Sequence, residues 1–280
     1  MTIETCKMPV IRIKNRGSTS RQESSVISKQ SEVPYFSSGL AMKLSIIMPV
    51  FNEVEYFDEI IGKVLSVDKM LDYEVIIIES NSTDGTRELV KKYEGKPKVK
   101  VIYQDKPLGK GNAVRLGIKN ASGDIILIQD ADTEYDPKDY AKLIKPILDG
   151  ETKFIIGSRK MGHNTWQIRN MKTNVLMAIF INIIGNSADE FFNLLYNVKL
   201  TDPQSMYKVF HKDCLNGVEL KSNYFDLDWE ICAKFVRNGH VPLELPVCYN
   251  SRGFVEGKKV KLSRDIFINI YAILYYRFFT

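Results

Sequence analysis

Short apolar runs alternate along residues 42–160 with stretches in which apolar residues recur at helical spacing. The runs predict strands at 44–49, 73–78, 99–103, 125–128 and 154–156. Between them, the spacing and the polar starts predict helices through 60–65, at 89–90 and over 110–119 and 137–148. Strands separated by helices of this length indicate an α/β fold with a mostly parallel central sheet, covered by helices on both faces.

The pattern changes after Arg159. Residues 166–198 are predicted to be largely helical, with an apolar run over Val175 to Ile184. An aromatic segment from Ile266 to Phe279 closes the chain. Both are shorter or more polar than the roughly 20 apolar residues that cross a bilayer. The first run either lies in a membrane interface or packs on the sheet, so we expect helical, amphipathic C-terminal additions without a transmembrane anchor.

The N-terminal 41 residues are rich in serine and basic residues and hold no apolar stretch long enough for a signal peptide. We interpret them as a disordered tail. A transit peptide is the alternative, disfavoured by Glu4, Glu23 and Glu32. The predicted organisation is therefore a tail over 1–41, a main folded domain over 42–260 and an aromatic helix over 261–280.

Composition and charge narrow the classes of function. The 280 residues are 44% hydrophobic and 26% charged, as in globular proteins. A net charge of +5 suits phosphorylated ligands or an anionic membrane surface and is too weak to indicate nucleic acid. The four cysteines and three histidines are scattered, which disfavours a disulfide framework, a zinc site or a histidine metal site. We therefore expect a cytoplasmic protein, peripheral on the cytoplasmic face of a membrane if it contacts one.

Two carboxylates follow the central predicted strand. Asp130 and Asp132 lie two residues apart, so an extended chain would point both the same way. Open α/β sheets bind ligands at the carboxyl ends of their strands, and one or two carboxylates with substrate phosphates commonly hold Mg²⁺ or Mn²⁺. We interpret the pair as a metal site. The alternative is an acidic loop.

Other polar residues follow neighbouring strands and are expected at the same edge. The first strand leads to Phe51-Asn52-Glu53 and the second to Glu79 and Asp84. Carboxylates there could contact a base and a ribose, or Asp84 could shape a turn and cap a helix. Gly109-Lys110-Gly111-Asn112-Ala113 only partly resembles the dinucleotide-binding fingerprint and follows the third strand, not the first. We interpret it as a helix start, although Lys110 or Arg115 could face a phosphate.

Taken together, these motifs resemble those of the family 2 glycosyltransferases, specifically the relatives that act on dolichyl or polyprenyl phosphates. The likeness covers about residues 43–260, and the order and spacing of the motifs carry it. They are Ser45–Glu53, Ser82–Thr86, Gly109–Ala113 with Gly117, Gly123-Asp124 leading to Asp130-Ala131-Asp132, Gly157-Ser158-Arg159, Thr201–Gln204 and Asp228–Ile231.

The resemblance implies the Rossmann-like glycosyltransferase A fold and an inverting, metal-dependent transfer from a UDP- or GDP-linked sugar. The donor contacts that it implies are Pro49, Phe51, Glu53, Glu79, Asp84, Lys110, Asp130, Ala131 and Asp132, with the metal at Asp130 and Asp132. It places Arg159 and Arg169 at an acceptor phosphate, and Asp202 and Asp228 on the acceptor side. Arg252 and the basic run near Lys258-Lys259 could bind phosphate or anionic lipid, or form a solvated surface.

The acceptor decides which catalytic groups are needed. A lipid phosphate, the acceptor that we expect, is already anionic and needs no base. A saccharide or other hydroxyl needs a carboxylate to take its proton, for which Asp228 is the candidate; Asp228 could instead cap a helix. Outside the enzymes, the alternative is a sugar-nucleotide-binding protein without turnover. The sequence departs from the family at two places. The family usually has a second acid where Ser80 follows Glu79, so the preference for a particular nucleobase is not indicated. It usually has a small-residue loop where Ser205-Met206-Tyr207 stands, so the acceptor preference is not indicated either.

Overall fold

The computed structural model describes residues 42–67, 71–163, 175–251 and 262–280. Its strands are β1 (Lys43–Val50), β2 (Asp72–Glu79), β3 (Val99–Tyr103), β4 (Ile125–Ile128), β5 (Phe154–Ser158), β6 (Lys208–His211) and β7 (Leu243–Pro246). Its α-helices are α1 (Phe57–Leu65), α2 (Thr86–Lys91), α3 (Lys110–Asn120), α4 (Tyr140–Leu148), α5 (Arg159–His163), α6 (Val175–Tyr196), α7 (Leu227–Arg237) and α8 (Leu262–Phe278). Two 3₁₀ turns, η1 (Pro137–Asp139) and η2 (Lys212–Leu215), complete the elements.

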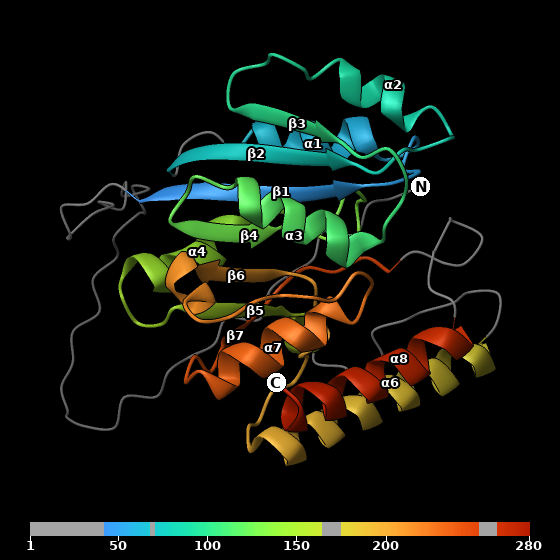
Figure 1. The fold of residues 1–280 in the computed structure, drawn as a ribbon, viewed down its shortest axis with the longest axis vertical. Coiled ribbons are helices and arrows are strands. Elements are labelled where there is room, and N and C mark those ends of the chain that lie inside the picture. Colours follow the sequence, from blue (N-terminus) through green and yellow to red (C-terminus); the bar gives the residue numbers. More distant parts are fainter. Residues whose placement is uncertain (1–41, 68–70, 164–174, 252–261) are drawn as a thin grey trace, which may run out of the picture. The chain divides into compact units, whose positions relative to one another are not determined.

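The described strands form one mixed sheet in the order β3-β2-β1-β4-β6-β5-β7 (Figure 1). Strand β1 pairs in parallel with β2 and with β4, while β6 is antiparallel to both β4 and β5. Since β7 is parallel to β5, β6 alone among the described strands runs against the others. The carboxyl ends of the other six strands therefore point to one edge of the sheet. The α/β fold class predicted from the sequence is confirmed.

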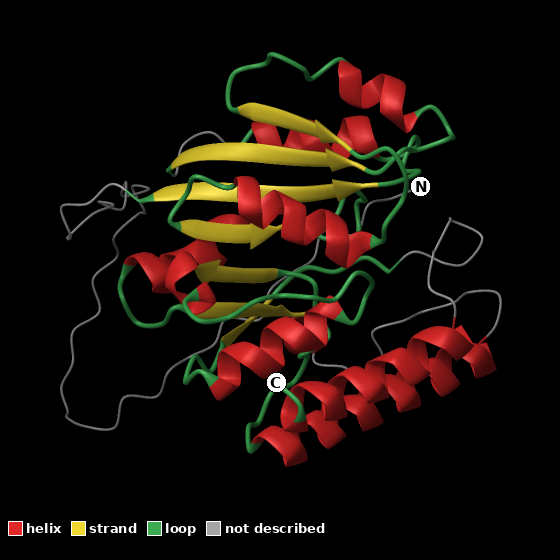
Figure 2. Cartoon of the chain, viewed as in Figure 1, coloured by secondary structure: helices red, strands yellow, loops and turns green. Residues whose placement is uncertain are grey.

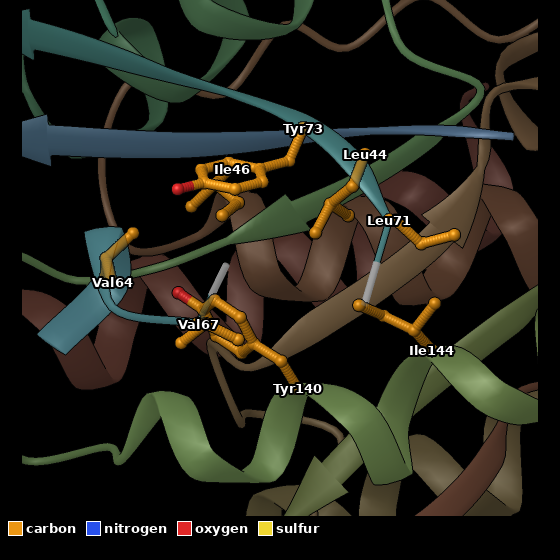
Figure 3. Close-up of a pocket in the computed structure, with 8 residues that line it drawn as sticks. All are labelled: Leu44, Ile46, Val64, Val67, Leu71, Tyr73, Tyr140 and Ile144. Carbon is orange, nitrogen blue, oxygen red and sulfur yellow. The ribbon is translucent and has the colours of Figure 1, made fainter. Parts of the chain in front are cut away.

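Helices cover both faces of the sheet because both faces of its strands are apolar (Figure 2). Ile46 and Ile47 are neighbours in β1 and point to opposite faces, yet both are buried. On one face α3 approaches so closely that Gly117 faces Ile47. On the other face α1 and α4 pack over Ile46 (Figure 3).

A small apolar cavity remains between α1, α4 and the amino ends of β1 and β2 (Figure 3). Its volume is about 10 Å³, room for about one water molecule. The two tyrosine hydroxyls at its border are already bonded, Tyr73 to the Leu65 carbonyl at 3.3 Å and Tyr140 to Gln129 at 2.9 Å. The cavity is a packing gap in the core and does not fit a substrate.

Helices α6 and α8 lie side by side and pack against α7 at their C-terminal halves (Figure 1). The Tyr196 hydroxyl near the end of α6 donates to the Ile273 carbonyl of α8 at 2.8 Å, and Arg237 of α7 donates to the Tyr276 carbonyl at 2.7 Å. Within the described ranges, no helix combines the length and apolar character needed to cross a membrane.

Two strands were missed by the pattern of apolar runs. Strand β6 has only four residues, one of them the buried Lys208, and β7 ends in Pro246. A lysine and a proline interrupt the apolar signal, so only pairing with β4 and β5 defines these strands. The predictions for residues 1–41 and 164–174 lie outside the described residues, and the domain boundary near residue 260 stays a prediction.

Replacing Gly117 by alanine is expected to destabilise the protein by about 1–3 kcal/mol through overpacking. A Cβ there would lie 2.3 Å from Ile47 Cγ2 and 2.8 Å from Ile78 Cδ1. Gly62→Ala in α1 is the matched control, because nothing lies within 4 Å of its Cβ, and alanine should stabilise that helix by up to about 1 kcal/mol. Urea denaturation measures both changes. Shifts of the same sign in both variants would contradict the close contact at Gly117.

Candidate functional site

The loops that follow β1 and β2 are tied together by hydrogen bonds. The backbone N–H of Asn52 donates to Ser82 Oγ at 3.0 Å, and the N–H of Thr83 donates to Asn52 Oδ1 at 2.8 Å. Asn52 and Asn81 take positive φ angles of 52° and 58°, which asparagine tolerates better than most residues. The sequence therefore shapes two adjoining loops at the carboxyl edge of the sheet.

Asp84 lies within this pair of loops. One of its oxygens accepts from the backbone and hydroxyl of Thr86, at 3.0 and 2.6 Å, and the other accepts from the Val54 N–H at 3.2 Å. Partial burial alone would raise the pKa of Asp84, but these hydrogen bonds hold it below its usual value. Asp84 thus fixes the start of α2, as the turn-shaping alternative expects. Its contact with a nucleoside stays a prediction.

Glu79, at the end of β2, is fully buried beneath the same loop. It accepts from the backbone of Asn81 and Ser82, at 3.2 and 2.6 Å, and pairs with Arg87 at 3.1 Å. The other predicted donor contacts on this side are more accessible. Pro49, Phe51 and Glu53 are half-buried at the end of β1 and in the loop after it.

Lys110 and Asp130 form an ion pair at the centre of the edge. Lys110 begins α3, and its Nζ lies 2.5 Å from Asp130 Oδ1. Burial alone would lower the pKa of Lys110, but Asp130, with Asp228 and Asp132, raises it. One ammonium group therefore lies among three carboxylates that come from two separate segments of the chain.

The second predicted metal ligand, Asp132, is buried, as is Ala131 before it. Strand β4 ends at Ile128, so both acids lie in the loop that follows it. Asp132 Oδ1 accepts from the Glu134 N–H at 3.0 Å. Within the described part of the chain, no group of three or more His, Cys, Asp or Glu residues could hold a metal ion. Two carboxylates fit a Mg²⁺ or Mn²⁺ whose other ligands are water and substrate phosphates.

Asp228 faces this cluster from α7. It is the second residue of a helix whose N-cap is Asp226, so the expectation that Asp228 could cap the helix is wrong. Its Oδ1 accepts from Lys208 at 3.3 Å. Burial raises the pKa of Asp228, which stays above its usual value although Lys208 and Lys110 lower it. Lys208 is fully buried and also donates to the carbonyls of Pro203 and Ser205.

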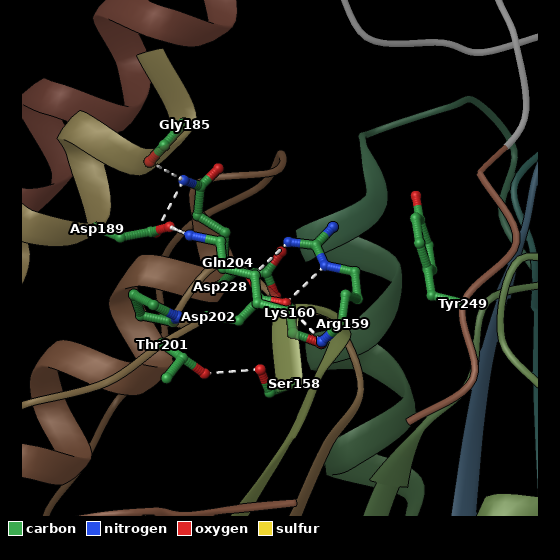
Figure 4. Close-up of polar contacts among 12 residues, drawn as sticks. Ser158, Arg159, Lys160, Gly185, Asp189, Thr201, Asp202, Gln204, Asp228 and Tyr249 are labelled. Atoms are coloured by element: carbon green, nitrogen blue, oxygen red, sulfur yellow. Dashed lines mark hydrogen bonds and ion pairs between the residues drawn. The ribbon is translucent and has the colours of Figure 1, made fainter. Parts of the chain in front are cut away.

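Arg159 and Asp202 form a two-pronged ion pair beside the cluster (Figure 4). Arg159 Nε and Nη2 donate to the two carboxylate oxygens at 2.7 Å each, and the Arg159 backbone N–H donates at 3.0 Å. Burial alone would raise the pKa of Asp202, but Arg159 holds it below its usual value. The guanidinium also lies 5.3 Å from the ring centroid of Tyr249. Asp202 is fully buried, so it acts through Arg159.

The other two predicted phosphate residues, Arg169 and Arg252, lie outside the described residues. Of the predicted set, Lys110, Asp130, Asp132 and Asp228 are close enough to interact, as are Arg159 and Asp202. Glu79 ends β2, and Asp84 lies in the loop that follows it.

Sequence reasoning missed a set of amide contacts that join the edge together. Gln104 after β3 accepts from Ser80 and donates to Asn112 of α3, each at 2.8 Å. Asn112 donates in turn to Asn223 at 3.1 Å, and Arg115 donates to the same Asn223 oxygen at 2.8 Å. Arg115 therefore holds a loop, where a phosphate contact was considered. The sequence signal that could have identified Asn112 is its place within the Gly109–Ala113 motif.

Comparison with known proteins identifies the family of this chain. Residues 45–213 match the model of the family described as glycosyl transferase family 2. Over 239 residues the chain is 30% identical to a dolichol-phosphate mannosyltransferase of Pyrococcus furiosus. The aligned region covers 83% of this chain and 64% of that relative. Over 153 residues it is 24% identical to an undecaprenyl-phosphate 4-deoxy-4-formamido-L-arabinose transferase of Photorhabdus laumondii, covering 53% and 46% of the two chains.

Solved structures share the fold. Glucosyl-3-phosphoglycerate synthase from Mycobacterium tuberculosis, in complex with Mn²⁺, UDP and glucosyl-3-phosphoglycerate, superposes with a TM-score of 0.61 over 84% of this chain and 80% of that one, at 19% identity. The same enzyme has been solved with Mg²⁺ and UDP. Because the family model matches residues 45–213, more than half of the chain, this chain belongs to glycosyl transferase family 2.

Proposed function

We propose that this protein transfers a sugar from a nucleotide diphosphate sugar to a polyprenyl or dolichyl phosphate, with inversion and with Mg²⁺ or Mn²⁺. The observation that carries the proposal is the arrangement at one sheet edge. Asp130, one of two carboxylates after β4, pairs with Lys110, and Arg159, which follows β5, pairs with Asp202. The relatives named for dolichol phosphate and undecaprenyl phosphate support the proposed class of acceptor. The Mn²⁺ and UDP in the structural neighbour support the proposed donor and metal.

On the donor side, Asp130 and Asp132 would hold the cation together with the diphosphate. A bound divalent cation would offset the negative charge that develops on the leaving nucleoside diphosphate. Lys110 lies 2.5 Å from Asp130 and so adds a fixed positive charge at the same place. The half-buried Phe51 and Glu53 border the loops where the nucleoside would lie.

On the acceptor side, the guanidinium of Arg159 is oriented by Asp202, and a guanidinium binds phosphate oxygens in a fixed geometry. A phosphate monoester attacks through an oxygen that already carries charge, so no base has to remove a proton. This fits a site in which Asp228 already neutralises the buried Lys208.

One observation favours a hydroxyl acceptor instead. The pKa of Asp228 is raised by burial, and a carboxylate with a raised pKa is a better general base near neutral pH. The second alternative, a sugar-nucleotide-binding protein without turnover, predicts donor binding with no transfer.

An exposed apolar surface supports a lipid substrate. We call the outward side of α6 and α8 the apolar stripe. Its residues, with their exposed fractions, are Leu176 (81%), Phe180 (53%), Ile183 (54%), Phe267 (75%), Ile270 (43%), Tyr271 (64%), Leu274 (36%) and Phe278 (64%). Exposed apolar side chains that gather on a pair of neighbouring helices often mark a surface that binds a partner or a membrane.

An anionic membrane surface fits the apolar stripe best. Residues 252–264, which lead into α8, contain Arg252, Lys258, Lys259, Lys261 and Arg264 against a single acid, Glu256. Basic residues beside an aromatic apolar helix face are typical of helices that lie in the membrane interface. The three free cysteines of the described chain suit a reducing compartment, so we propose contact with the cytoplasmic face.

Asp130→Ala and Asp132→Ala are each expected to lower sugar transfer by about 100-fold or more, since charge stabilisation at the leaving group contributes effects of this size. Both should also abolish the rise in melting temperature that UDP- or GDP-sugars produce with Mn²⁺. Asp149→Ala, an exposed acid paired with Lys145 at the end of α4, is the control. Unchanged transfer and Mn²⁺-dependent stabilisation in both site variants would refute the metal assignment.

Asp228→Asn separates the acceptor classes. With a polyprenyl phosphate we expect transfer within about tenfold of wild type, whereas a role as general base predicts a loss of about 10²–10⁴-fold. Because Lys208 would lose its counter-charge, Asp228→Asn with Lys208→Met is measured alongside, with the melting temperature as a check on folding. Transfer to a saccharide but not to polyprenyl phosphate by the wild type would overturn the acceptor proposal.

The protein is expected to float with vesicles that contain phosphatidylglycerol and to be released by salt. Phe267→Ser with Phe278→Ser should weaken flotation about tenfold or more, because two exposed aromatic side chains are lost from the apolar stripe. Val241→Ser, an exposed apolar residue before β7, is the control. Absence of flotation, together with a lipid-free dimer that the double variant dissociates, would assign the apolar stripe to self-association instead.

A further inference from the structure

The inward side of α6 includes buried polar residues near its middle, among apolar ones such as Ile181 and Phe192. Asp189 and Asn182 are 3% and 5% exposed, and Gly185 lies between them, whereas Leu176 on the outward side is 81% exposed. A helix at the surface of a globular protein usually has its apolar side inward and its polar side outward. The burial of polar groups in this part of α6 therefore calls for an explanation, which their contacts provide.

Asp189 is the centre of the buried polar contacts (Figure 4). Its Oδ2 lies 2.5 Å from Lys160 Nζ, and its Oδ1 accepts from Gln204 Nε2 at 3.0 Å. The same Gln204 amide donates to the Gly185 carbonyl at 3.1 Å, one turn earlier in α6. Both side-chain partners of Asp189 thus come from outside α6.

These two partners are neighbours of the acceptor pair in the chain. Lys160 directly follows Arg159 in α5, and Gln204 lies two residues after Asp202. A single carboxylate of α6 therefore holds the segment that carries Arg159 and also the segment that carries Asp202. Ser158 and Thr201 add a third link between the same two segments, with hydroxyl oxygens 2.7 Å apart.

Stability alone does not account for the pair. A buried ion pair contributes little net stability, and apolar residues of the same volume often do as well, but its directional bonds define a geometry. Burial raises the pKa of Asp189 to about 7, although Lys160 lowers it, and the nearby Asp202 raises it further. The charged form of Asp189 is therefore disfavoured by its surroundings, although the side chain is buried beside Lys160.

We propose that Asp189 and Lys160 are positioning residues of the acceptor subsite, through which α6 fixes the Arg159–Asp202 pair for an anionic phosphate. The inference rests on the proposed function for the role of Arg159. It adds that the helix bearing the apolar stripe also holds the phosphate-binding guanidinium in place. Contact of α6 with a lipid surface and binding of a lipid phosphate are thereby linked through one buried carboxylate.

Binding of farnesyl phosphate, measured by calorimetry on the full chain, tests the inference without turnover. Asp189→Asn and Lys160→Met are each expected to weaken binding about tenfold, and Lys160→Arg should restore most of it because a guanidinium also pairs with a carboxylate. In transfer assays the same variants should raise KM for polyprenyl phosphate and leave donor hydrolysis and donor KM within about twofold.

Lys234→Met is the control for a merely structural role. Lys234 pairs with the buried Glu230 of α7 at 2.7 Å and is 11% exposed, close to the 14% of Lys160. It should lower the melting temperature comparably and leave farnesyl phosphate binding unchanged. The inference is overturned if Asp189→Asn and Lys160→Met bind farnesyl phosphate as wild type does, or if Lys234→Met weakens binding as much as they do.

The outcomes also separate the inference from the proposed function. A wild type that binds farnesyl phosphate, is weakened by the two variants and transfers no sugar to it would refute the function and support the inference. A wild type that transfers sugar to polyprenyl phosphate while the variants keep its KM would support the function and refute the inference. No binding of farnesyl phosphate by the wild type would refute both.

Discussion

The parallel pairing of β1 with β2 and β4 is the constraint on which the site depends. In this register the last residues of β1 and β2 lie beside each other, Val50 opposite Glu79, and β4 ends beside Ile47. Every loop that carries a candidate functional residue on this half of the sheet therefore starts from the same edge. A change of direction in any of these strands would send its acids to the opposite edge.

At that edge, buried charges come in pairs. Lys110 meets Asp130, Lys208 meets Asp228, Arg159 meets Asp202, and Lys160 meets Asp189. Each pair limits the penalty of burial, and each fixes the direction of a side chain. The fold thereby supplies cations beside carboxylates in a water-poor setting, which suits the phosphorylated donor and acceptor that we propose.

The helices α6 and α8 carry apolar side chains on their outward side, and α6 also buries the polar Asn182 and Asp189 on its inward side. In water, an outward row of Phe267, Tyr271 and Phe278 gains nothing from folding, since these side chains remain exposed. Their exposure is favourable only when a second apolar medium covers them. The buried Asp189 of α6, meanwhile, contacts Lys160 and Gln204, so under the proposed function the inward side of the helix orders the segments of the acceptor pair.

The sequence by itself determined the parallel α/β core, because runs such as Ile125–Ile128 between helical repeats leave few other ways to bury their side chains. It also located Asp130, Asp132 and Arg159 at strand ends. Tertiary structure decided the antiparallel β6, whose buried Lys208 looks like a surface residue in the sequence, and it decided the partners of each charge. Local patterns report periodicity and turn chemistry, whereas the pairing of Asp189 with Lys160, 29 positions apart, depends on how α5 and α6 pack.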